Sequence, residues 1–178
     1  MGVGIAVLLG AAPTRKAEVY RFSFVAVSVA AFLALALQSY LPLHFPSVNL
    51  LDLPLLVVIY IALTRRDPVA ALLAGALIGM AQDSLTRGPI GLLGAVKTVI
   101  GYVTSSASVH LDTESSGIRL ITACILYALH FALFYLLGAI LLGQLIEWDS
   151  QARLLGMLVN ALAGVLLFKV LDRFRKPA

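Results

Sequence analysis

Charged residues are scarce in this chain of 178 residues. Asp, Glu, Lys and Arg together make up 12% of it, against about 25% in an ordinary soluble domain. Hydrophobic residues make up 61%, and the mean hydropathy is +0.99. A surface this apolar cannot face water, so the sequence predicts an integral membrane protein. No long polar segment interrupts the chain, and a soluble domain is therefore not expected on either side of the membrane.

Cysteine and histidine are also rare. Cys124 is the only cysteine and lies in an apolar run, which excludes an intrachain disulfide, an iron–sulfur cluster and a cysteine-based zinc site. His44 and His110 fall in predicted loops on opposite sides of the membrane, and His130 falls in the middle of a predicted span. Three histidines so placed cannot share one metal ion. We therefore expect neither a metal site nor a cofactor.

Catalytic motifs are missing too. The chain has no Walker sequence, no HExxH and no nucleophile elbow. Its serines cannot be combined with a histidine and an aspartate at one membrane depth. We therefore expect no catalytic residue, and a protein that is not an enzyme.

Apolar segments lie at about 22–41, 47–63, 68–83, 90–109, 118–142 and 152–171. They predict an all-α membrane protein with six transmembrane helices. The second and third segments are at or below the roughly 17–25 residues that a spanning helix needs. They either cross a thin region buried in protein or include the polar residues at their ends. We favour the second explanation, which puts Asp52 and Asp83 inside helices near one face. A re-entrant hairpin over 47–83 is the alternative.

The segments divide the chain into an N-terminal cytoplasmic tail (1–21), a transmembrane domain (22–172) and a short cytoplasmic tail (173–178). The first residues, MGVGIAVLLGAAP, lack a basic stretch before their apolar run, and Arg15 and Lys16 follow that run. This order is wrong for a cleaved secretory signal. We expect a disordered or membrane-surface tail there.

Lysine and arginine set the expected orientation. If both termini are cytoplasmic, ten basic residues lie inside: Arg15, Lys16, Arg21, Arg65, Arg66, Arg119, Lys169, Arg173, Arg175 and Lys176. Only Arg87 and Arg153 then lie outside. This bias predicts cytoplasmic termini and places Asp52, Asp83 and Lys97 toward the outer half of the bilayer.

Small residues recur every four positions in four predicted helices, where they let helix backbones approach closely. The rows are Ala26, Ala30 and Ala34; Ala71, Gly75 and Gly79; Lys97, Gly101 and Ser105; and Gly156, Asn160 and Gly164. Each row either packs inside the bundle or docks another membrane protein. The first row is the best candidate for docking, because it contains no strongly polar residue.

Polar residues inside the spans need partners, because a charge at the bilayer centre costs roughly 2.5–3.5 kcal/mol on insertion scales. A hairpin turning near residue 90, at RGPIG, would set Asp83 level with Lys97. We therefore predict an intramembrane pair between Asp83 and Lys97, with Arg87 as a rival partner for Asp83. His130 and Asn160 are expected to be structural, hydrogen-bonded groups. An ion path is not expected, because the ionisable groups gather near one face.

Residues 50–102 resemble the MreD family of bacterial rod-shape-determining membrane proteins. The similarity lies in LDLPLLVVIYIAL with Asp52 and Tyr60, in the basic loop TRRD, and in GALIGMAQDSLTRGPIGLLGAVKTVIGY. The last stretch combines a glycine-rich helix, an acid and a glycine–proline turn with PIG at 89–91. Six spans and the chain length agree with the family, whereas residues 1–19 extend beyond its usual start.

The resemblance implies a non-enzymatic scaffold of the plasma membrane that acts in cell elongation and peptidoglycan synthesis and helps to set rod cell shape. Its direct partner would be an MreC-like single-span protein. Its indirect partners would be MreB, the RodA glycosyltransferase and a class B penicillin-binding transpeptidase. The implied fold is similar to the substrate-binding components of energy-coupling-factor vitamin transporters. Such a component is the alternative function, since it too uses an AxxxA face on its first helix.

Overall fold

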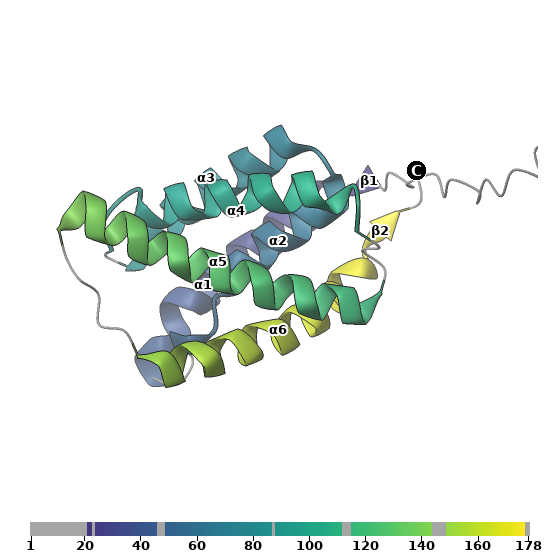
Figure 1. The fold of residues 1–178 in the computed structure, drawn as a ribbon. Coiled ribbons are helices and arrows are strands. Elements are labelled where there is room, and N and C mark those ends of the chain that lie inside the picture. Colours follow the sequence, from purple (N-terminus) through teal and green to yellow (C-terminus); the bar gives the residue numbers. More distant parts are fainter. Residues whose placement is uncertain are drawn as a thin grey trace, which may run out of the picture.

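The computed structural model describes residues 21–22, 24–45, 49–86, 88–111, 115–143 and 149–176. In these residues the chain forms six helices and two very short strands, which confirms the all-α prediction (Figure 1). The helices are α1 (Phe24–His44), α2 (Leu53–Arg65), α3 (Pro68–Thr86), α4 (Leu92–Ser108), α5 (Ser116–Leu142) and α6 (Ser150–Asp172). The strands are β1 (Arg21–Phe22) and β2 (Arg175–Lys176).

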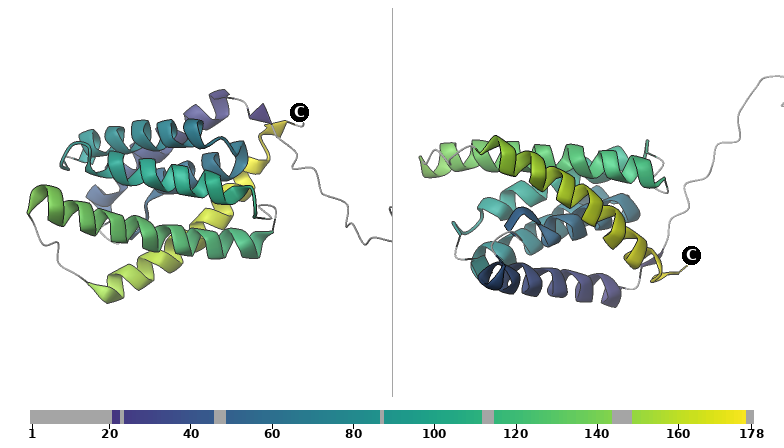
Figure 2. Two further views of the ribbon diagram at one scale, coloured as in Figure 1. Left: turned by 45° about the horizontal axis from the view of Figure 1, so that its top comes forward. Right: turned by 90° about the horizontal axis from the view of Figure 1, so that it is seen from below.

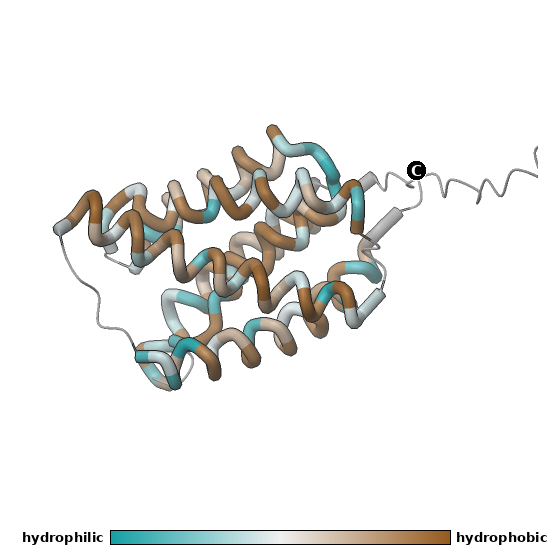
Figure 3. Tube along the Cα trace, in the orientation of Figure 1, coloured by the Kyte–Doolittle hydropathy of each residue, from teal (hydrophilic) through white to brown (hydrophobic). Residues whose placement is uncertain are grey.

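Four helices, α1, α3, α5 and α6, are long and apolar enough to cross a membrane. The chain is therefore a multi-pass membrane protein, and Figure 3 shows hydrophobic residues along each of its helices. The helices α2 and α4 are shorter, with 13 and 17 residues. Six complete crossings accordingly stay a prediction. Because α3 by itself is long enough to cross the membrane, a re-entrant hairpin over 47–83 is not favoured.

The shortest helix, α2, lies at the centre of the bundle. It contacts each of the other five helices, and its residues from Leu55 to Leu63 are at most 4% exposed. A helix that is apolar on all its faces is typically buried, with protein on every side. Asp52 is the N-cap of this helix and does not lie inside it. The explanation that extended the second span to include Asp52 is therefore wrong, and burial in protein accounts for the short helix. For the third span the same explanation is confirmed, because α3 continues to Thr86 and contains Asp83.

In the hairpin of α3 and α4, glycine residues allow the backbones of the two helices to touch. A Cβ added at Gly75 would lie 2.2 Å from the Lys97 carbonyl oxygen. One at Gly79 would lie 2.5 Å from the Leu93 oxygen, and one at Gly101 would lie 2.4 Å from the Ala71 oxygen. The rows on α3 and α4 thus pack against each other and set the register of the hairpin.

The two ends of the bundle are joined. Strand β1, just before α1, pairs antiparallel with β2, just after α6. The start of α1 and the end of α6 therefore meet at one end of the molecule, as all views show (Figures 1 and 2). This agrees with an arrangement in which both ends of the helical bundle lie on the same side of the membrane.

Candidate functional site

A buried charged cluster lies where α2 begins. The Lys97 Nζ atom of α4 donates to the Asp52 Oδ2 atom at 2.6 Å. The Lys97 side chain is 0% exposed and that of Asp52 is 15% exposed. His130 of α5 brings its Nε2 atom to 3.6 Å from the same carboxylate oxygen. The cluster therefore joins the start of α2 to α4 and α5.

Two amides complete this cluster by satisfying the backbone that precedes α2. Asn160 of α6 accepts from the Asp52 N–H at 2.8 Å and donates to the Leu50 carbonyl at 2.6 Å. Gln38 of α1 accepts from the Leu53 N–H at 3.1 Å. Non-helical backbone at membrane depth is tolerated only where protein covers and satisfies it. Asn160 and Gln38 supply those partners here.

The predicted pair between Asp83 and Lys97 is wrong, because Lys97 pairs with Asp52. The reason is the register of the α3–α4 hairpin. Lys97 lies level with Gly75, and Asp83 is eight residues further along α3. Eight residues of helix correspond to about 12 Å. The turn between Thr86 and Leu92 includes the predicted position near residue 90, so the prediction missed the register of the two helices and not the place of the turn.

Asp83 has a different role, as the cap of α4. Its carboxylate accepts from the backbone N–H groups of Gly91 at 2.9 Å and of Leu93 and Gly94 at 3.2 Å. The first N–H groups of a helix have no partner within the helix. Asp83 satisfies them from the neighbouring helix while it is only 1% exposed. The rival partner Arg87 lies outside the described residues.

The cluster lies deeper than its sequence position indicates. His130 and Asn160 fall near the middle of α5 and α6, and both contact the residues that begin α2. Asp52 and Lys97 therefore lie at the level of mid-helix residues of α5 and α6, while the prediction that the ionisable groups gather near one membrane face stays a prediction. Asp52 lies at this level because α2 begins in the middle of the bundle.

A second polar cluster lies at the opposite end of the bundle. Arg119, near the start of α5, pairs with Asp172, at the end of α6, at 2.5 Å. The Tyr60 hydroxyl of α2 donates to the other oxygen of Asp172 at 3.0 Å. The sequence alone identifies Arg119 only as an expected cytoplasmic cation. The missed signal is an acid at the end of one span and a base at the start of its antiparallel neighbour.

The remaining small residues are also part of the packing. Ala30 and Ala34 of α1 pack against the apolar core, and Ala34 is 6% exposed. A Cβ at Gly156 would meet the Tyr127 hydroxyl at 2.3 Å, and one at Gly164 would meet a Leu56 methyl at 3.2 Å. The row of Ala26, Ala30 and Ala34 therefore faces the protein core at Ala30 and Ala34. Its assignment as the leading docking face is not supported.

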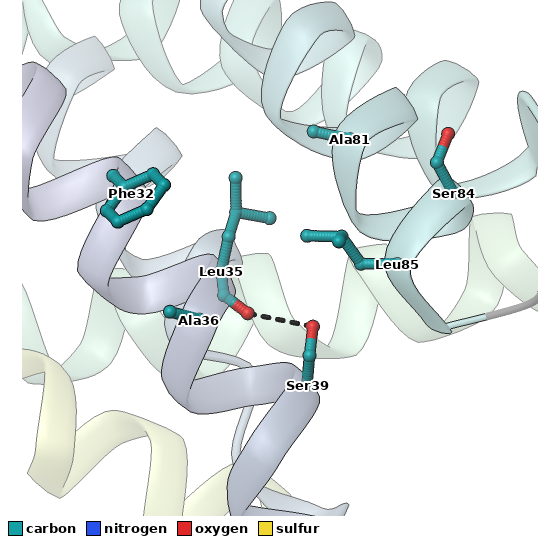
Figure 4. A pocket seen from close by; sticks show the side chains of 7 residues that line it. All are labelled: Phe32, Leu35, Ala36, Ser39, Ala81, Ser84 and Leu85. Carbon is teal, nitrogen blue, oxygen red and sulfur yellow. Dashed lines mark hydrogen bonds between the residues drawn. The ribbon is translucent and has the colours of Figure 1, made fainter.

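The outward surface of α1 is a better candidate for docking. Only 6% of its apolar span is buried, which makes α1 the least covered of the four long spans. Between α1 and α3 runs an apolar groove of about 500 Å³ (Figure 4). It is lined by Phe32, Leu35, Ala36 and Ser39 of α1 and by Ala81, Ser84 and Leu85 of α3.

The described residues that line the groove leave no hydroxyl group without a hydrogen bond. Ser39 donates to the Leu35 carbonyl at 2.9 Å, and Ser84 donates to the Met80 carbonyl at 3.0 Å. Both hydroxyls are thus satisfied within their own helices. An uncharged, apolar occupant fits such a surface, and the small side chains of Ala36 and Ala81 permit close approach.

Within the described ranges, no three side chains of His, Cys, Asp or Glu lie close enough together to hold a metal ion. The chain matches no family model, no curated protein and no solved structure.

Proposed function

We propose that this chain is a non-enzymatic scaffold of the bacterial plasma membrane that binds an MreC-like single-span protein and helps to set rod cell shape. Through that partner it would act with MreB, the RodA glycosyltransferase and a class B penicillin-binding transpeptidase in cell elongation. Its termini would be cytoplasmic. The observation that carries the proposal is the surface of α1 and α3, where an apolar groove borders a span that is barely covered.

The groove supports a partner that itself lies in the membrane. Its lining residues carry no charge, and its two serines are already hydrogen-bonded. A single apolar helix could lie along α1 and α3 without leaving a polar group unsatisfied. Helix association in lipid depends on this kind of close packing, because lipid tails are as apolar as the side chains they replace.

The resemblance supports the same proposal through the elements that it covers. LDLPLLVVIYIAL becomes the cap and body of the central helix α2, and the longer stretch becomes the α3–α4 hairpin. The acid at Asp83 caps α4, while Asp52 and Lys97 hold α2 to α4. The charged residues of these stretches thus serve the architecture, as expected of a scaffold.

Affinity purification from native membranes in mild detergent tests the proposal. An MreC-like protein should co-purify with the intact chain. Ala36→Trp should reduce its recovery, whereas Ala128→Trp should not, because Ala128 is an exposed alanine that lies on α5, away from the groove. Failure of the wild-type chain to retain such a protein would contradict the scaffold. Retention by both variants would preserve the scaffold and move the contact to another face.

A substrate-binding component of an energy-coupling-factor-type vitamin transporter is the second candidate. The buried polar residues at the start of α2 favour it, because discontinuous helices often carry binding sites in transporters. Lys97 and Asn160, however, are fully covered by protein, and Asp52 is already bonded to both. Co-purification of a bound vitamin with ATPase subunits would establish this candidate in place of the scaffold.

A further inference from the structure

Arg153 is a cation with no acidic partner among the residues that the structure describes. It lies in the first turn of α6, partly buried, and no carboxylate of the described residues lies within 4.0 Å of it. Its Nε atom is buried and makes no hydrogen bond. The other buried cations described above, Lys97 and Arg119, each pair with an aspartate. Arg153 therefore differs from Lys97 and Arg119 in having no carboxylate partner among the described residues.

An aromatic ring holds the Arg153 guanidinium in place. Its Cζ atom lies 3.7 Å from the centre of the Phe131 ring on α5. Tyr127, one turn earlier on α5, is close enough to interact with the guanidinium. An arginine that merely reached for water would extend away from the helices. The Arg153 guanidinium instead lies over the Phe131 ring of α5, and a guanidinium held on an aromatic ring keeps N–H donors that can bind an anion.

A second nitrogen without a partner lies beside the same ring. His130 is 4% exposed, its ring meets Phe131 edge-on at 6.3 Å between centres, and its Nδ1 atom makes no hydrogen bond. The nearest acid is Asp52, 3.6 Å from His130 Nε2, and Lys97 offsets its charge. The described surroundings of Phe131 are therefore not dominated by negative charge.

We propose that Arg153, seated on Phe131, binds the phosphate of an anionic lipid in the half of the membrane where α5 ends and α6 begins. Arg153 is three residues into a helix of 23 residues, so it lies within about one turn of the helix end. Phosphates of lipid headgroups are found at that depth, and a guanidinium binds a phosphate through two parallel hydrogen bonds. The site is independent of the groove between α1 and α3.

Native mass spectrometry of the protein in nanodiscs made of phosphatidylglycerol and phosphatidylcholine tests the site. The wild-type chain should retain phosphatidylglycerol preferentially. Arg153→Gln should reduce that preference about tenfold, as expected for the loss of hydrogen bonds to a charged group. Arg153→Lys should reduce it less, since the charge remains but the fork and the stacking are lost. Lys169→Gln, an equal loss of charge at the opposite end of α6, should leave it unchanged.

Competition with inorganic phosphate separates the two sources of the same chemistry. If phosphate in solution displaces the lipid, the site takes phosphate as such; if it does not, the site takes the headgroup together with its acyl chains. The proposal is overturned if Arg153→Gln keeps the wild-type preference. It is also overturned if Lys169→Gln loses as much, because general charge then explains the binding. Thermal unfolding of each variant checks that the fold is retained.

Discussion

Lys97 Nζ and Asp52 Oδ2 lie 2.6 Å apart, although the whole of α3 separates the two residues along the chain. Lys97 is completely covered by protein. A buried pair of this kind gives little net stability, but removing one partner leaves a charge that nothing compensates. The pair is therefore best tested by comparing single and double substitutions.

We expect Lys97→Ala to destabilise the protein by about 3–5 kcal/mol, the usual cost of breaking a buried pair. The cause is the Asp52 carboxylate, which would stay buried without its ammonium partner. Thermal unfolding in detergent, followed by the fraction that elutes as folded protein, measures the effect. Lys169→Ala is the matched control, because Lys169 is exposed on α6.

The double variant Asp52→Asn with Lys97→Met should recover part of that loss, since residues in contact couple non-additively. Additive effects of the two substitutions would show that the pair is not formed in the membrane.

We expect Asp83→Ala to destabilise the protein through α4, by about 2 kcal/mol, at the upper end of the range for a lost helix cap. Asp83→Asn should cost less, because its amide oxygen still accepts one hydrogen bond. Hydrogen exchange at Leu93 and Gly94 should increase in the alanine variant before the rest of the bundle opens. The charge swap Asp83→Lys with Lys97→Asp should rescue nothing, and a rescue would contradict the register described above.

We expect Gly75→Ala to prevent the close packing of α3 on α4. The added methyl group would lie 2.2 Å from a backbone oxygen, which cannot move away as a side chain can. Overpacking typically costs about 1–3 kcal/mol. Gly117→Ala serves as the control, since its nearest neighbour would be a side-chain atom at 3.9 Å. Equal yields of folded protein from both variants would be inconsistent with the contact.

The asymmetry of basic residues predicts that both termini are cytoplasmic. Reporter fusions after Ala178 and in the loop at 143–151 should therefore report opposite sides of the membrane, with the loop outside. A periplasmic C-terminus would reverse the orientation and place the start of α2 toward the cytoplasm. Because β1 and β2 pair, the beginning of α1 and the end of α6 should report the same side.

Periodic and compositional signals predicted the helices well. Long apolar runs mark α1, α5 and α6 within a few residues, and the glycine rows mark the surfaces that join α3 to α4. His130 and Asn160 are predicted as hydrogen-bonded structural groups, and Asn160 is indeed hydrogen-bonded to Leu50 and Gly156. His130 differs, because its Nδ1 atom makes no hydrogen bond and its Nε2 atom lies 3.6 Å from Asp52.

Partners across the bundle were not predictable in the same way. Symmetric pairing about residue 90 would set Asp83 level with Lys97, whereas the two helices pack with Gly75 level with Lys97, and this difference in register misassigned Lys97 to Asp83. The contact with Asp52 also depends on α2 lying at the centre, which no local pattern reveals. An apolar run of 13 residues reads the same whether lipid or protein surrounds it.

The burial of α2 has a consequence for the order in which the protein can be made. At about 20 Å, α2 is too short to cross about 30 Å of hydrocarbon on its own. In lipid it would also expose the backbone groups of Leu50 and Asp52, whose partner Asn160 is synthesised 110 and 108 residues later. The ribosome therefore delivers the central helix after α1 but well before α5 and α6, which complete its surroundings. We therefore expect α2 to be held at the membrane surface, in the insertion machinery or by a chaperone until α6 has been synthesised. The other helices then pack around it.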